Sequence, residues 1–209
     1  MNSRTRVVAV LLAAGRSRRM GAFKPLLPFG GRTVVETCAA NLHGGGAGEV
    51  IVVVGHRGEE VRAAVSHLPF VRFAVNEMAE SEMGVSIARG VSSLSEDAEA
   101  VLVALVDQPA ITPGVVSEIL SARGRGGARL VVPTWEGRGG HPVLVDLALR
   151  EELLTLAPEK GLRAVFDRHR PEVLRLPVGS PFVARDMDTW DDYRSLHQDV
   201  FGSPPPGTD

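Results

Sequence analysis

The chain has 209 residues, of which 44% are hydrophobic and 23% charged, and its formal net charge is −2. This balance is typical of a globular protein with room for one α/β domain, and it argues against a disordered chain. Without a basic excess, nucleic acid is not an expected partner. A single cysteine, Cys38, excludes an internal disulfide and fits a reducing compartment. The apolar run over residues 7–14 is too short to span a bilayer, so we expect a cytoplasmic protein without a membrane partner.

Apolar, β-branched runs alternate along the chain with segments of helical periodicity. The expected strands cover residues 7–12, 50–54, 71–75, 101–106, 130–132, 141–145 and 172–176. The expected helices cover residues 33–42, 56–68, 86–94, 113–122, 148–156, 161–169 and 189–198. Runs that are apolar at every position are typical of parallel strands buried on both faces, whereas the alternation over 71–75 favours an edge strand.

The alternation of strand and helix predicts right-handed crossovers and an α/β fold. We expect a Rossmann-like, doubly wound, mostly parallel sheet with a short antiparallel addition after Pro133. Ligands of such sheets bind at the carboxyl ends of the strands. The loops that follow Leu12, Val54, Val75 and Val106 are therefore the candidate binding loops.

A loop rich in small residues follows the first expected strand. Residues 13–15 let the backbone approach a ligand closely, and successive amides in such a loop can bind an anion. Arg19 and Lys24 add positive charge beside it. The loop contains neither Gly-Lys-Ser/Thr nor Gly-x-Gly-x-x-Gly, so it matches neither the P-loop nor the nicotinamide-binding fingerprint. A plain turn with solvated arginines is the structural alternative.

Two acidic positions are candidates for a metal site. Asp107 comes directly after a buried strand, and Asp188 comes just before the last helix. Carboxylates together with phosphate oxygens are a common way to hold Mg²⁺. The structural alternatives are a turn cap for Asp107 and a helix N-cap for Asp188.

The segment from Leu12 to Pro28 resembles a signature of sugar-phosphate and cofactor nucleotidyltransferases, Leu-Ala-Ala-Gly-x-Ser-x-Arg-Met-Gly-x-x-Lys-x-Leu-Leu-Pro. It is most similar to the molybdenum cofactor cytidylyltransferase family of MobA-like NTP transferases. The resemblance implies a fold of the nucleotide-diphospho-sugar transferase type. It also implies transfer of CMP from CTP to the phosphate of molybdopterin, with release of pyrophosphate.

The resemblance also assigns roles to residues. It implies Mg²⁺ on Asp107 and Asp188, and catalytic roles for Arg19, Lys24 and Asp107. The residues expected at the nucleotide are Leu12, Ala13, Ala14, Gly15, Arg16, Ser17, Arg19, Lys24, Gly84 and Ser86. Those expected at the acceptor are Gly139, Gly140, His141 and Arg163. Residues 1–200 would form one domain, with about 1–133 for the nucleotide and 134–200 for the acceptor, followed by a disordered tail over 201–209.

Four alternatives stay open. Met83-Gly84 reverses the usual Gly-Met of the family, so GTP remains a possible donor. The acceptor can also be a sugar or alditol phosphate. A third alternative is a non-catalytic module that delivers the cofactor to a molybdenum hydroxylase or its chaperone. A nicotinamide-dependent oxidoreductase is the least supported of the four. Ser86 can also be a helix N-cap, and His141 and Arg163 can be ordinary loop and surface residues.

Overall fold

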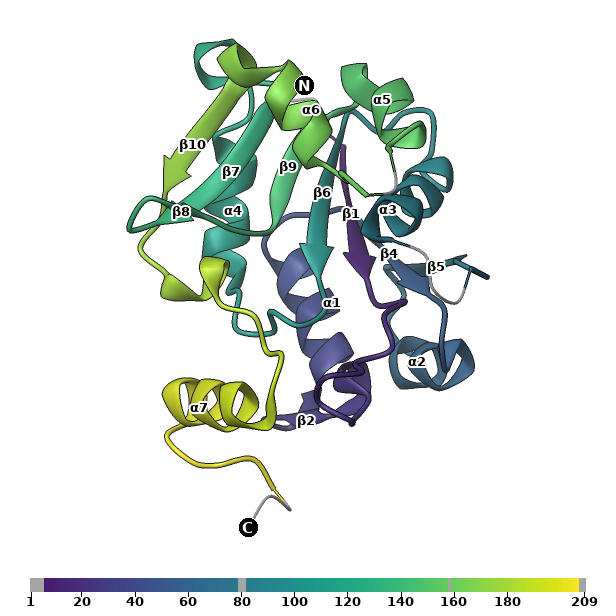
Figure 1. Ribbon diagram of the computed structural model, residues 1–209, viewed down its shortest axis with the longest axis vertical. Helices are drawn as coiled ribbons and strands as arrows, with labels where there is room; N and C mark the ends of the chain where they lie inside the picture. The colour runs from purple at the N-terminus through teal and green to yellow at the C-terminus, as the bar shows by residue number, and fades with distance from the viewer. Residues whose placement is uncertain (1–5, 79–81, 158, 207–209) are drawn as a thin grey trace.

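A computed structural model describes residues 6–78, 82–157 and 159–206. Its central sheet has eight strands, and seven of them follow the order β10-β7-β9-β6-β1-β4-β5 (Figure 1). These are β1 (Val7–Leu12), β4 (Glu49–Val54), β5 (Val71–Val75), β6 (Ala100–Leu105), β7 (Leu130–Trp135), β9 (Val143–Asp146) and β10 (Val173–Pro177). The eighth, β8 (Arg138–Gly139), pairs with β7.

The sheet is mostly parallel, as the sequence predicts. β1 pairs in parallel with β4 and β6, and β4 with β5, which lies at the sheet edge as expected. β9 is the antiparallel addition, because it runs against both β6 and β7. A separate two-stranded sheet joins β2 (Pro28–Phe29) to β3 (Arg32–Thr33). The Rossmann-like fold class is confirmed.

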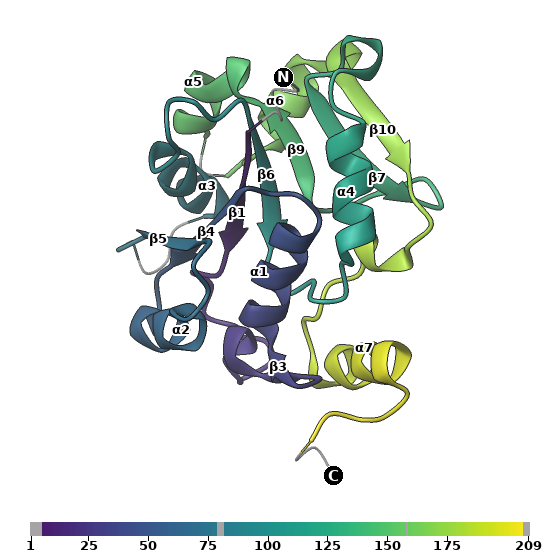
Figure 2. The same cartoon turned by 180° about the vertical axis from the view of Figure 1, so that it is seen from behind.

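Helices cover both faces of the sheet. The helices are α1 (Val34–Gly44), α2 (Gly58–Val65), α3 (Met83–Ser92), α4 (Pro113–Ser121), α5 (Arg150–Leu154), α6 (Arg163–Arg168) and α7 (Trp190–Phe201). α3, α5 and α6 lie on the face that is nearer in Figure 1, while α1, α2 and α4 cover the face seen in Figure 2. Alternate residues of β1 enter two separate apolar cores: Ala9 and Leu11 pack toward α1, Val8 and Val10 toward α3. No helix among the described residues is long and apolar enough to cross a membrane.

Most expected elements differ from the structure at one or both ends, and three of these differences bear on the fold. β7 continues through Pro133 to Trp135. On one side of β7, pairing with β9 ends at Val131 and pairing with β8 begins at Thr134, so the proline interrupts neither ladder, while on the other side it stays in register with Leu176 of β10. Residues 148–156 form a 3-10 turn followed by the short α5 rather than one helix. α3 begins at Met83 instead of Ser86.

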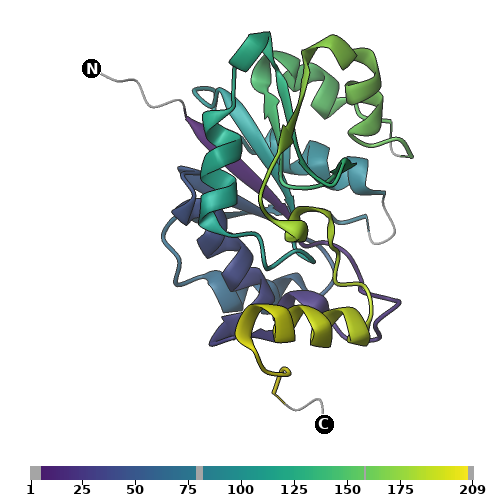
Figure 3. The same ribbon diagram turned by 90° about the vertical axis from the view of Figure 1, so that its left-hand side faces the viewer.

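The last helix lies beyond the carboxyl ends of the parallel strands, as Figures 1 and 3 show. Thr189 and Asp192 form a capping box at its start. The Tyr193 hydroxyl donates to the carbonyl of Pro28, and the Phe201 ring stacks edge-on against Phe29. The expected tail from residue 201 therefore begins inside α7, and residues 207–209 lie outside the described residues.

Candidate active site

An open cavity of about 510 Å³ lies at the carboxyl ends of β1 and β6. Backbone and side chains of the loop after β1 form one wall, and the beginning of α3 forms another. The lining residues are Leu12, Ala14, Gly15, Arg16, Ser17, Arg18, Lys24, Pro25, Asn76, Met78, Met83, Ser86, Leu105, Val106 and Asp107. A cavity in this position agrees with the strand-end rule that marked these loops in the sequence.

The loop after β1 holds its shape through its own contacts. Ser17 adopts a left-handed backbone conformation with φ of 52°, and its Oγ accepts a hydrogen bond of 3.1 Å from the Lys24 amide. The Ser17 carbonyl accepts from the amide of Gly21. Ala13 lies beneath the loop, because it is buried and its amide donates to the carbonyl of Val53. The amide of Ala13 is therefore already used within the sheet, and the expected contact of Ala13 with the nucleotide stays a prediction.

Lys24 connects the two predicted metal ligands. Its Nζ lies 2.6 Å from Oδ1 of Asp188 and 3.4 Å from Oδ2 of Asp107. The Lys24 side chain is only 9% exposed, so this ammonium group is held in a region of low solvent access. Arg19 donates to the other oxygen of Asp188 at 3.0 Å, while its own side chain is 81% exposed. The structure thus brings together four side chains that the sequence assigned to catalysis or metal binding.

The two aspartates have opposite electrostatic environments. Burial raises the pKa of Asp107 above its ordinary value, although Lys24 opposes this effect. The hydrogen bond from Lys24 lowers the pKa of Asp188, with a further contribution from Arg19. Asp188 is not a helix cap, since Thr189 caps α7. The N-cap alternative for Asp188 is therefore wrong, and its carboxylate contacts Lys24 instead.

One oxygen of Asp107 has no partner in the structure. Oδ1 of Asp107 is buried and accepts no hydrogen bond from the described residues. A buried carboxylate oxygen of this kind requires a donor or a cation. Two carboxylates beside this cavity are a donor set that Mg²⁺ or Mn²⁺ accepts, with further ligands from a substrate. The residues present therefore fit a divalent cation.

A buried polar pair lies at the other end of the cavity. The Asn76 Nδ2 group donates to Ser86 Oγ at 2.9 Å, and Asn76 Oδ1 accepts from the Met78 amide at 3.1 Å. Ser86 lies inside α3, so its N-cap alternative is wrong. Asn76 is a site residue that the sequence analysis did not assign, although it directly follows the edge strand in one of the four candidate binding loops. Gly84 is buried in the first turn of α3 and does not line the cavity.

The expected acceptor residues lie outside this cavity. Gly139 and Gly140 belong to the β8 turn, which comprises residues 136–141 and includes strand β8. The His141 amide donates to the carbonyl of Val183 at 2.9 Å. Burial lowers the pKa of His141, while the charge of Asp186 opposes the shift.

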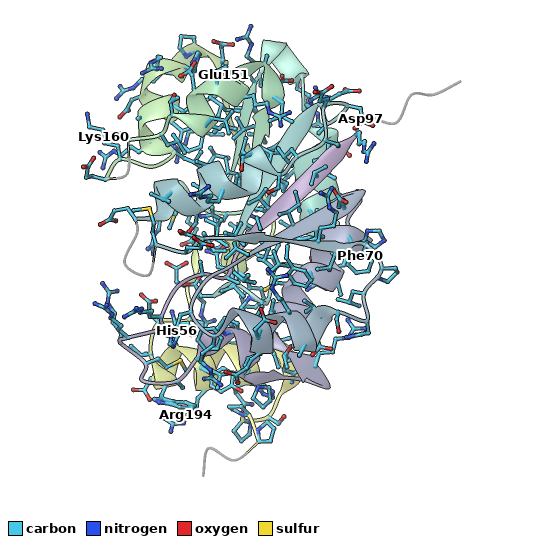
Figure 4. The ribbon with its side chains drawn as sticks, turned by 90° about the vertical axis from the view of Figure 1, so that its right-hand side faces the viewer. His56, Phe70, Asp97, Glu151, Lys160 and Arg194 are labelled. Atoms are coloured by element: carbon cyan, nitrogen blue, oxygen red, sulfur yellow. The ribbon has the colours of Figure 1, made fainter. Side chains whose placement is uncertain are left out.

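Arg163 is not brought to Lys24. Its side chain is 88% exposed at the start of α6, with its Nε 4.0 Å from Asp167. Figure 4 labels Lys160, in the turn before α6, in the upper part of the molecule, and His56, after β4, in the lower part. Arg163 is the first residue of α6, and α6 lies at the opposite end of the molecule from α7 in Figure 1.

Comparison with known proteins identifies the family. Residues 9–173 match the MobA-like NTP transferase domain. The chain belongs to this family. The cavity loop, Lys24 and Asp107 all fall within the matched range.

The relatives of this MobA-like chain are named for different activities. "Nicotine blue oxidoreductase" of Paenarthrobacter nicotinovorans is 34% identical over 88% of this chain and 92% of the relative. "Probable molybdenum cofactor guanylyltransferase" of Mycobacterium marinum is 29% identical over 85% of this chain and 87% of the relative. Among solved structures, Rv0371c of Mycobacterium tuberculosis H37Rv is 30% identical, with a TM-score of 0.82 over 93% of this chain and 99% of that one. A second structure of Rv0371c is a complex with manganese, at 29% identity over the same shares and a TM-score of 0.77.

The Ser86 hydroxyl offers a test of the cavity as a nucleotide site. We expect Ser86→Ala to weaken nucleotide binding by roughly 2- to 10-fold, the range of one ordinary hydrogen bond. Isothermal titration with CTP and GTP measures the change. Ser92→Ala is the matched control, because Ser92 is exposed on the same helix and donates to the Arg89 carbonyl. Equal affinity of Ser86→Ala and wild type for both nucleotides would exclude a contact with this hydroxyl.

Proposed function

We propose that this MobA-like transferase moves a nucleoside monophosphate, CMP from CTP, onto the phosphate of a molybdopterin-type acceptor. The observation that carries the proposal is Lys24, held between Asp107 and Asp188 at the edge of the 510 Å³ cavity. A buried cation beside two carboxylates suits a triphosphate bound with a divalent metal. The name of the Mycobacterium marinum relative supports the acceptor class, and it makes GTP the alternative donor.

The reaction would be an in-line displacement at the α-phosphorus. An acceptor phosphate oxygen forms the new bond to this phosphorus, the bond to the bridging oxygen of the β-phosphate breaks, and pyrophosphate leaves with that electron pair. The acceptor oxygen is already anionic, so no strong general base is required. The protein then contributes mainly position and charge.

The residues at the site have separate tasks in this scheme. Lys24 and Arg19 would bind phosphate oxygens and stabilise the leaving pyrophosphate. The loop from Ala14 to Ser17 would enclose the phosphates, and Ser86 with Asn76 would contact the base. Asp107 and Asp188 would hold Mg²⁺, which supplies positive charge to the phosphates when bound. The β8 turn with Gly140 and His141 would lie on the acceptor side, and a molybdenum hydroxylase or its chaperone would receive the product.

A second candidate rests on the name of the Paenarthrobacter nicotinovorans relative, which is an oxidoreductase. The chain contains no Gly-x-Gly-x-x-Gly fingerprint, which weighs against a nicotinamide enzyme. The 34% identity to this relative over 88% of the chain nevertheless requires that a redox activity be measured.

One assay separates these functions. Purified protein with Mg²⁺ is given CTP or GTP together with a molybdopterin-type acceptor, a sugar phosphate or an alditol phosphate, and pyrophosphate release is measured. We expect release with CTP and the molybdopterin-type acceptor. Release with GTP but not with CTP would overturn the proposal that CTP is the donor. Release only with a sugar phosphate or an alditol phosphate would overturn the proposed molybdopterin-type acceptor. No release in any combination, together with oxidation of a reduced nicotinamide, would replace the proposal with the oxidoreductase.

A further inference from the structure

Gln108 connects the two chain segments that carry the candidate metal ligands. It follows Asp107 directly, and it is 5% exposed. Its Nε2 donates to Oδ1 of Asp186 at 2.8 Å and to the carbonyl of Val183 at 3.4 Å. Both acceptors belong to the segment over residues 181–188, which runs from β10 toward α7 and contains Asp188.

A backbone hydrogen bond supports this connection. The Met187 amide donates to the carbonyl of Asp107 at 3.0 Å, and the Met187 side chain is fully buried. The dipeptide Asp107-Gln108 therefore holds residues 186 and 187 through both a main-chain and a side-chain contact. Asp188 is the next residue, so its position relative to Asp107 depends on these two bonds.

The contacts of the Asp188 carboxylate are of another kind. Lys24 and Arg19 contact it, and both are cations that the proposed function assigns to phosphate. A cation that turns toward a bound triphosphate gives up part of its contact with Asp188. Gln108 has no such competing role, because its donor group points to Asp186 and Val183 rather than into the nucleotide cavity.

We propose that Gln108 is a positioning residue that sets the separation of the Asp107 and Asp188 carboxylates, so that a divalent cation can bind between them. This inference rests on the proposed metal site. In this inference neither Gln108 nor Asp186 touches the metal, and the hydrogen bond between them orients the residues that do. Outer contacts of this type commonly change metal affinity without touching the metal.

The test measures Mn²⁺ binding to the purified protein without nucleotide, by electron paramagnetic resonance of the free ion. We expect Gln108→Leu to weaken Mn²⁺ binding by roughly 10- to 100-fold, as is usual for such outer contacts. Asn41→Leu is the matched control. Asn41 donates to the carbonyls of Pro109 and Ile111 and so supports the other side of the same turn. It should keep wild-type Mn²⁺ affinity even if its thermal stability falls.

Substitutions at Asp186 test the same hydrogen bond from its other end. Asp186 is exposed, so replacing it does not disturb a buried side chain. Asp186→Leu removes the acceptor of Gln108 and should weaken Mn²⁺ binding as Gln108→Leu does. Asp186→Asn keeps an acceptor oxygen and should remain close to wild type. The double variant Gln108→Leu/Asp186→Leu should bind Mn²⁺ no more weakly than Gln108→Leu alone, since Gln108→Leu already removes the contact with Asp186.

The outcomes distinguish this inference from the proposed function. If Asp188→Asn weakens Mn²⁺ binding while Gln108→Leu and Asp186→Leu do not, the role of Gln108 is overturned and the metal site stands. If Asp188→Asn itself binds Mn²⁺ as wild type does, the metal site fails, and the role of Gln108 fails with it. Additive losses in the double variant would also overturn the inference, because they would indicate two independent effects.

Discussion

Lys24→Met should lower the rate of pyrophosphate release by about 10²- to 10³-fold, the usual loss when one charged or hydrogen-bonding group that stabilises a transition state is removed. Methionine keeps most of the length and the apolar stem of lysine but carries no charge. The Nζ atom lies 2.6 Å from Asp188 and 3.4 Å from Asp107, so its loss also leaves two carboxylates without their shared cation. Steady-state kinetics of pyrophosphate release at saturating CTP and acceptor measure this effect.

Lys160→Met is the matched control for this variant. The chain has two lysines, and Lys160 is exposed in the turn before α6. Its replacement removes the same formal charge without a contact to either aspartate, and the rate should stay at the wild-type value. Equal rates for wild type and Lys24→Met would contradict the phosphate role of Lys24. A similar loss in both variants would indicate a dependence on net charge alone.

Much of the fold could be predicted from the sequence, because the buried strands carry their own signal. β1 and β5 begin and end at the expected residues: Arg6 precedes the apolar run of β1, and Asn76 follows the alternating run of β5. The start of α3 could not be predicted. Its N-cap, Glu82, makes no capping hydrogen bond with its side chain, so the helix begins without the usual marker. Packing against β1 and β4 holds this helix instead, and such packing is not visible in local sequence.

The candidate site could likewise be predicted only in part. Asp107 follows a strand that the sequence predicts, and Asp188 precedes a predicted helix. Lys24 joins them from the loop after β1, whose resemblance to a known signature marks it in the sequence. Contacts between distant segments were not predictable. Gln108 reaches Asp186 across 78 positions in the chain, and neither residue has a local pattern that marks the pair. Arg163 shows the opposite case, because the family resemblance marks it for the acceptor while the structure leaves its side chain 88% exposed at the start of α6.

Gly140→Ala should destabilise the protein by about 3 kcal/mol or more and lower Tm by roughly 6–12 °C for a chain of this size. A Cβ atom at Gly140 would lie 1.8 Å from the carbonyl oxygen and 2.4 Å from the carbonyl carbon of Val183. These are backbone atoms, and the same oxygen accepts from the His141 amide, so they cannot turn away as the end of a side chain could. Thermal unfolding followed by circular dichroism measures the change.

Gly179→Ala separates this steric effect from the general effect of replacing a glycine. No heavy atom lies within 4 Å of a Cβ built at Gly179, so this variant should unfold at or slightly above the wild-type temperature. Gly140→Ala should also reduce pyrophosphate release at temperatures where it remains folded. The displaced segment over residues 181–188 carries Asp188, and a shift of this carboxylate alters the site even though Gly140 does not line the cavity. Wild-type Tm and activity in Gly140→Ala would mean that the β8 turn and this segment are not in close backbone contact, and that the position of Asp188 does not depend on it.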